Sequence, residues 1–90
     1  MRTLSNDIKL TLTTTAQKLL GTNPTRTYAL FVNDSVETVY LGLGKDAVAN
    51  RGIRLNANGG SYEINLTNPF VGEIYGLVAA NAGAVLIQEW

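Results

Sequence analysis

The most constraining feature of this sequence is an alternation of apolar and polar residues with a period of two, which recurs along almost the whole chain. Near the start, Ile8, Leu10 and Leu12 are separated by lysine and threonine. Successive side chains of an extended strand point to opposite faces, so this pattern predicts half-buried strands. No long stretch shows the 3.6-residue period of an amphipathic helix. We therefore expect an all-β protein.

Turn-forming residues interrupt this alternation every eight to twelve residues, most clearly at positions 21–24, 58–60 and 81–83. About seven to eight short strands separated in this way predict a single antiparallel β-sandwich or jelly-roll-like domain. We expect the domain to span residues 8–90. Residues 1–7 are polar and poorly patterned, and they are expected to form an N-terminal arm, which either reaches a neighbouring molecule or is a disordered tail.

Two local expectations concern the middle of the chain. Residues 27–34 and 37–44 are alternating runs joined by a short polar turn, so they predict a β-hairpin. The residues of the first run expected to face the core are Tyr28, Leu30 and Val32. Residues 45–50 are compatible with one helical turn, although so short a segment cannot form a stable helix alone.

Several strands are apolar on both faces, which an isolated two-sheet sandwich does not require. Phe31, Tyr75 and Leu77 are expected to face outward, and Leu86 and Trp90 share one face of the last strand. Such residues are covered either by another subunit or by the chain's own loops. We expect a homo-oligomer, in which a second copy supplies the cover.

Composition excludes most kinds of chemistry. The 90 residues include no histidine and no cysteine, which removes the commonest general base, the commonest transition-metal ligand and any disulfide framework. Seven basic and seven acidic residues give a net charge of zero, which argues against tight non-specific binding to nucleic acid. The most apolar run, residues 76–87, is shorter than the about 20 residues that a membrane-spanning helix needs. We expect no enzymatic activity, catalytic residue, cofactor, metal, small-molecule substrate, nucleic acid or membrane partner.

The glycines at positions 42 and 44 invite comparison with a phosphate-binding loop, because Lys45 follows them. That motif needs serine or threonine after the lysine, whereas this chain has Asp46. We therefore interpret Gly42 and Gly44 as permitting a bulge or the close approach of another chain segment. No two carboxylates have a spacing that indicates glycoside hydrolysis, and no serine has a histidine partner.

The remaining candidates are surface contacts. Arg51 and Arg54 either bind carboxylates of a partner or are ordinary surface arginines. The aromatic residues suit a sugar-binding platform or a protein interface, with packing in the interior as the alternative for at least half of them. The aromatic residues concerned are Tyr40, Tyr62, Tyr75 and Trp90.

Residues 13–90 also contain a characteristic series of short motifs. An Asn-Pro-x-Arg turn precedes an apolar strand, and Val-Tyr-Leu-Gly, Gly-Ile-x-Leu, Gly-Gly-Ser-Tyr-Glu and Ile-Tyr-x-Leu-Val-Ala-Ala follow, before a last strand that ends in Glu-Trp. In this order the motifs resemble a group of small β-sandwich virion proteins of tailed bacteriophages. That group includes capsid decoration (cement) proteins, head-fibre bases and domains of tail and fibre proteins.

The resemblance implies a structural virion protein, and a free-standing module of this kind looks most like a capsid decoration protein. Such a protein is made in the host cytoplasm, binds the outer capsid surface and stabilises the head. The implied partners are the protein itself, as a homotrimer, and the major capsid protein. The alternative is a tail- or fibre-associated receptor- or carbohydrate-binding module. The candidate interface residues are Phe31, Tyr40, Arg51, Arg54, Tyr75, Leu86 and Trp90.

Overall fold

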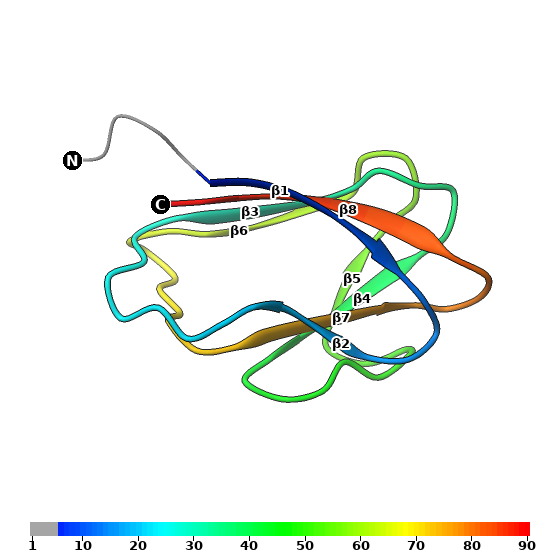
Figure 1. Ribbon diagram of the computed structural model, residues 1–90, viewed down its shortest axis with the longest axis horizontal. Coiled ribbons are helices and arrows are strands. Elements are labelled where there is room, and N and C mark those ends of the chain that lie inside the picture. The colour runs from blue at the N-terminus through cyan, green and yellow to red at the C-terminus, as the bar shows by residue number, and fades with distance from the viewer. Residues whose placement is uncertain (1–5) are drawn as a thin grey trace.

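The computed structural model describes residues 6–90, which form eight strands and no helix (Figure 1). The strands are β1 (Asn6–Leu12), β2 (Gln17–Leu20), β3 (Ala29–Asn33), β4 (Val39–Leu43), β5 (Ile53–Leu55), β6 (Ser61–Ile64), β7 (Ile74–Val78) and β8 (Gly83–Glu89). Sheet A has the order β1-β8-β3-β6, and sheet B has the order β2-β7-β4-β5. The two antiparallel sheets confirm the expected all-β sandwich. Residues 6–90 accordingly contain no helix that could span a membrane.

The strand pairing is nested. β1 pairs with β8, β2 with β7, β3 with β6 and β4 with β5, all antiparallel. This is the order of a jelly roll, in which a long hairpin bent between β4 and β5 is rolled up so that its arms alternate between two sheets. The β3–β8 and β4–β7 pairs then complete the two sheets. Strands from opposite ends of the chain therefore lie side by side in Figure 1.

The hairpin expected from residues 27–34 and 37–44 is wrong, because β3 belongs to sheet A and β4 to sheet B. The connection between them instead crosses from one sheet to the other. Asn33 holds this crossing in place: it is completely buried, and its side-chain amide donates to the carbonyl oxygens of Glu37, Leu55 and Asn56 at 2.6, 3.1 and 3.2 Å. Since the β5–β6 connection contains Asn56, one amide ties two crossing segments together.

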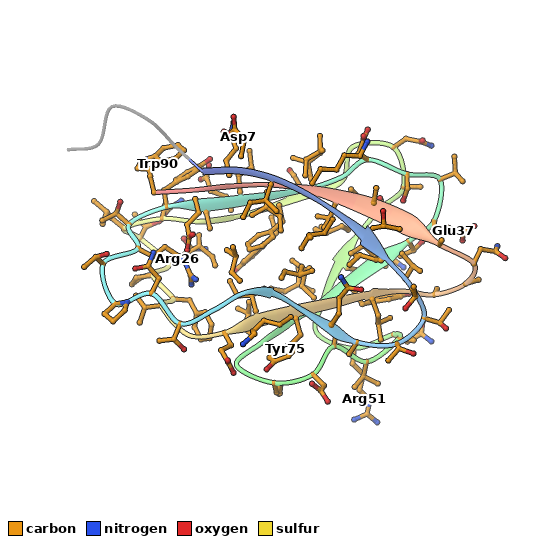
Figure 2. All side chains as sticks on the ribbon, viewed as in Figure 1. Asp7, Arg26, Glu37, Arg51, Tyr75 and Trp90 are labelled. Carbon is orange, nitrogen blue, oxygen red and sulfur yellow. The ribbon has the colours of Figure 1, made fainter. Side chains whose placement is uncertain are left out.

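The opposite end of the sandwich is closed by Arg26, which is 5% exposed. Its Nε donates to the Glu89 carboxylate at 2.7 Å, and its other nitrogens donate to the carbonyl oxygens of Gly21, Phe70 and Gly72. Figure 2 shows Arg26 between the two layers. Removing one partner of such a buried ion pair costs about 3–5 kcal/mol, because the other charge is left uncompensated.

The apolar core fills the space between the two sheets. Its largest completely buried side chains are Phe31, Leu12, Leu41, Leu55, Ile64, Ile74, Ile87, Val39, Val78 and Val85. The inward faces of β1, β4 and β7 are those that the alternation predicts, and in β8 the face with Val85 and Ile87 is the inward one. Each fully buried aliphatic or aromatic side chain contributes about 1.5–3 kcal/mol relative to an exposed one, so this layer supplies most of the stability.

In β3 the prediction of the inward face is wrong. Ala29 and Phe31 are completely buried, whereas Leu30 and Val32 lie on the outer side of sheet A. Both faces of β3 are apolar, so the strand's own residues do not distinguish them. The neighbouring strands decide, because Phe31 stands opposite the inward-facing Ile87 of β8. Phe31 is therefore a core residue and not part of an interface.

The sandwich begins two residues earlier than the expected boundary at residue 8. Asn6 and Asp7 belong to β1 and pair with Glu89 and Gln88 of β8. The rest of the expected arm, residues 1–5, lies outside the described residues.

Candidate assembly surface

The outer face of sheet A is apolar along its centre and remains accessible to solvent. In the register of the sheet, Val32 of β3 stands opposite Leu86 of β8, and Leu30 stands opposite Gln88. Leu86 is 38% exposed, whereas Leu30, Val32 and Ala84 are half-buried. We call Leu30, Val32, Ala84 and Leu86, with Tyr28 and Trp90 at one end, the open strip.

An aromatic groove lies at the Tyr28 end of the open strip. The rings of Tyr28 and Trp90 are stacked, with centroids 4.3 Å apart and an angle of 23° between their planes. Backbone hydrogen bonds in both directions between these two residues extend the β3–β8 ladder by one step. The groove has a volume of about 440 Å³ and is lined by Thr27, Tyr28, Asn65, Leu66, Thr67 and Trp90. Leu66 is 79% exposed and supplies an aliphatic wall.

Glu63 of β6 fixes the walls of this groove. Its carboxylate accepts hydrogen bonds from the Tyr28 hydroxyl at 2.6 Å and from the Asn65 amide at 2.7 Å. The bond from Tyr28 favours the charged carboxylate, so it lowers the pKa of Glu63 and raises the pKa of the Tyr28 hydroxyl. The Asn65 Oδ1 in turn accepts hydrogen bonds from the backbone N–H and the hydroxyl of Thr67. The loop that carries Leu66 is therefore tied to the sheet.

Charged side chains border the open strip. Asp7 and Lys9 lie along β1, Glu63 lies on β6, and Asp34 follows β3, 4.0 Å from the Lys9 ammonium. All four residues are exposed. Among the described residues, the three carboxylates and one ammonium of this rim sum to a net charge of −2. The surface is therefore apolar at its centre and acidic at its rim.

The outer face of sheet B is covered by the chain itself. The loop formed by residues 44–52 folds back over the sheet, and Ala47 packs against Tyr40 and Leu77, all three being at most 6% exposed. A Cβ atom on Gly42 would lie 2.9 Å from the Ala47 backbone nitrogen, so glycine is needed for this close approach. Of the two explanations for doubly apolar strands, cover by the chain's own loop holds on this sheet.

The helical turn expected over residues 45–50 is not formed. Gly44, Asn50 and Gly52 have φ values of 75°, 66° and 73°, in the left-handed region that interrupts a right-handed helix. The Tyr40 hydroxyl donates to the Asn50 Oδ1 at 3.0 Å and holds the end of the loop against the sheet.

This covered face is basic. Lys45, Arg51 and Arg54 are exposed, and within residues 6–90 no hydrogen bond or ion pair is formed by either guanidinium. Both arginines border a cavity of about 230 Å³ together with Tyr40, Asn50 and Gly52. Figure 2 shows Arg51 projecting away from sheet B, on the opposite side of the molecule from Asp7.

The other charged groups on the sheet B side are Lys18, Asp46 and Glu73. The Lys18 ammonium lies 3.2 Å from the Glu73 carboxylate, and it is the main reason that the pKa of Glu73 is lowered. Among the described residues, four cations and two carboxylates on this side sum to a net charge of +2. The neutral chain is thus electrostatically two-sided.

The seven candidate interface residues do not form one surface. Leu86 and Trp90 belong to the open strip of sheet A. On the sheet B side lie Tyr40, which is buried under the loop, Arg51 and Arg54, which are exposed, and Tyr75, which is half-buried and donates to Glu73 at 3.1 Å. Phe31 lies in the core.

Sequence reasoning missed Tyr28, Leu30, Val32 and Leu66 as surface residues. The first three were expected in the core, and the error in the face of β3 accounts for them. The alternation in β6, where Glu63 stands between the inward-facing Tyr62 and Ile64, indicates which face of sheet A is outward. This indication applies to β3 only once it is known that β6 pairs with β3.

No group of three or more carboxylates that could hold a metal ion occurs in the described part of the chain. Comparison of the chain with models of protein families, with curated proteins and with solved structures finds no match.

Proposed function

We propose that this protein is a structural virion protein of the capsid decoration (cement) type, which binds the outside of a phage head and stabilises it. The observation that supports this most is the open strip, a row of apolar side chains on a sheet face with an acidic rim. Exposed apolar patches bordered by polar residues mark interaction sites. The order of the sequence motifs resembles that of phage β-sandwich proteins, and this resemblance supports the virion as the assembly to which the protein belongs. The jelly roll alone is less specific, because capsid proteins and lectins share it.

This role requires binding and no reaction. A protein that binds the assembled head but not its dissociated subunits stabilises the head by mass action. Linked copies bind several capsid subunits together and gain affinity through avidity. In this proposal the protein is a homotrimer whose partners are itself and the major capsid protein, and it acts on the outer capsid surface after synthesis in the host cytoplasm. The proposal includes no catalytic activity and no cofactor.

The test uses undecorated heads of the phage that encodes the chain. We expect the purified protein to co-sediment with these heads, to raise their melting temperature and to appear on the shell by electron microscopy. Replacing Leu86 by aspartate should weaken binding by at least about tenfold, because it places a charge in the apolar strip. Val36→Asp is the matched control, since Val36 is 78% exposed on the β3–β4 connection. Density at the tail tip, or no binding to heads, would contradict the proposal.

A second candidate function is a tail- or fibre-associated carbohydrate-binding module, and the aromatic groove favours it. Stacked aromatic rings present an apolar surface for the C–H face of a sugar. Amide and hydroxyl groups that are held in place by hydrogen bonds can fix the orientation of that sugar. Binding to a glycan array that is lost in Trp90→Ala and retained in Leu86→Asp would favour this candidate. Head binding without glycan binding would exclude it.

A further inference from the structure

We infer that the open strip is covered by a second copy of this chain in a head-to-tail contact, with the sheet A side of one copy against the sheet B side of the next. The inference rests on the proposal that the open strip is an assembly surface, and it assigns that surface to the contact between copies. The linked copies then bind the head through other surfaces, and Leu86→Asp weakens head binding because the avidity of the linked copies is lost.

The sheet A side and the sheet B side of the molecule carry complementary charges. Within residues 6–90, the rim of the open strip carries Asp7, Asp34 and Glu63, and Lys9 is the one cation beside them. The opposite side of the molecule is the basic one, with a net charge of +2. An arginine guanidinium can bind a carboxylate through two parallel hydrogen bonds, so both arginines are suited to an acidic rim.

The apolar parts of the two sides also correspond. Val48 is 51% exposed on the loop that covers sheet B, next to Arg51, whose backbone N–H donates to the Val48 carbonyl oxygen at 3.1 Å. An apolar residue thus stands beside basic ones on this side, as apolar residues stand beside acidic ones on the other. Docking Val48 near Leu86 would bury both while the charges meet around them.

The dimensions of the molecule set an upper limit on the area of the contact. The molecule measures 38 × 22 × 19 Å, and in the view of Figure 1, down the shortest axis, the two sheets are stacked vertically. Each outer face therefore measures 38 by 19 Å. The enclosing rectangle of about 720 Å² is slightly below the about 800 Å² that each partner contributes to a standard interface, so the contact has to cover most of each face.

A two-fold symmetric contact between two open strips is disfavoured by the same charges. In such a contact the same patch is used by both molecules, so the acidic rim of one molecule, with its net charge of −2 among the described residues, would meet the equally acidic rim of the other. Like charges placed together at an interface cost several kcal/mol. A head-to-tail contact uses two different patches, and its repetition gives the closed ring of the proposed homotrimer only if successive copies are rotated by 120°; otherwise it gives an open filament.

The experiment compares two charge-reversed proteins by analytical ultracentrifugation. One carries Arg51→Glu and Arg54→Glu, which makes the sheet B side acidic. The other carries Asp7→Lys and Glu63→Lys, which makes the sheet A side basic. We expect the wild-type protein to self-associate, and we expect each variant alone to associate at least about tenfold more weakly, because like charges now meet. High salt should weaken the wild-type contact.

Mixing the two variants in equal amounts gives the decisive result. Every contact between unlike molecules then joins an acidic side to a basic side, so association should return. Glu37→Lys is the matched control, since Glu37 lies at the end of the sandwich (Figure 2) and its replacement should leave association unchanged. Circular dichroism and urea denaturation establish that each variant is folded.

The inference is overturned if the wild-type protein is monomeric up to millimolar concentration, if the arginine variant associates as the wild type does, or if the mixture stays monomeric. The second result would indicate a two-fold contact between open strips. The outcomes of this experiment can be distinguished from a failure of the proposed function. A monomer that still binds heads contradicts only the head-to-tail contact. A protein that associates but does not bind heads contradicts only the role in the capsid.

Discussion

The two outer faces of this sandwich differ in how their apolar side chains are covered. Each sheet has strands that are apolar on both sides. On sheet B, Tyr40 and Leu77 are covered by Ala47 of the chain's own loop. On sheet A, Leu86 and Trp90 remain accessible. The difference shows that an apolar outer face is by itself no sign of an interface, because the distinction lies in whether the chain supplies its own cover.

The covered face should therefore contribute to the stability of the monomer, and the open face to association. The same type of substitution on the two faces is expected to have different effects.

Truncating a leucine on each face gives the largest contrast. Leu77→Ala should lower the free energy of unfolding by about 3 kcal/mol, since it opens a cavity under the loop. Leu86→Ala should lower it by less than about 1 kcal/mol, since Leu86 is already 38% exposed. Urea denaturation at a concentration where the protein is monomeric measures both values. Equal losses would show that the two faces contribute alike to the monomer.

Lifting the loop off sheet B should have the next largest effect. A Cβ atom on Gly42 would lie 2.5 Å from the backbone oxygen of Lys45, so Gly42→Ala must displace the loop. We expect a loss of about 2 kcal/mol in the free energy of unfolding. Gly21→Ala is the control, because no atom lies within 4 Å of the Cβ it would carry. A Gly42→Ala protein as stable as the wild type would mean that the loop is not held closely.

The hydrogen bond that anchors the loop should matter less. Tyr40→Phe removes the donor to the Asn50 side chain and leaves that oxygen poorly satisfied, at a cost of about 1 kcal/mol. The thermal unfolding midpoint would fall, and amide exchange should accelerate in residues 44–52. An unchanged exchange rate in this loop would argue that apolar packing alone holds it.

The smallest effects concern two carboxylates, Glu63 on the sheet A side, which is exposed, and Glu73 on the sheet B side, which is half-buried. The pKa of Glu63 is lowered first by the Tyr28 hydroxyl, whereas the pKa of Glu73 is lowered first by Lys18. Tyr28→Phe should thus return the pKa of Glu63 toward its ordinary value near 4.5. Tyr75→Phe should leave most of the lowering at Glu73 in place. NMR titration of the side-chain carboxyl carbons measures both, and similar shifts in the two variants would contradict this assignment of causes.

The direction of the pKa shift at Glu63 determines how its contribution to the stability of the folded protein changes with pH. A carboxyl group whose pKa is lowered by folding stabilises the folded protein at pH values above its ordinary pKa. That contribution is lost as the pH falls through the lowered pKa of Glu63. The groove wall held by Glu63 should then loosen, which broadening of the Tyr28 ring signals would reveal.

The alternation predicted the strands and most of their inward faces, as in β1, where Ile8, Leu10 and Leu12 face the core. It failed in β3, where Phe31 and Leu30 are equally apolar. The alternation predicted the polar turn after β3 but not the contacts made there, since the Asn33 amide donates to the carbonyl oxygen of Leu55, 22 positions further along the chain.

The sequence by itself determined the periodicity, the turns and the lack of histidine and cysteine, because these depend only on residues close together in the chain or on composition. The tertiary structure decided which strands pair, which face of β3 is buried and which outer face receives a cover. Those features depend on contacts between distant segments, such as the ion pair of Arg26 with Glu89. The charge asymmetry belongs to the same group, since it arises only when the jelly roll sorts the charges of a neutral chain onto opposite sides.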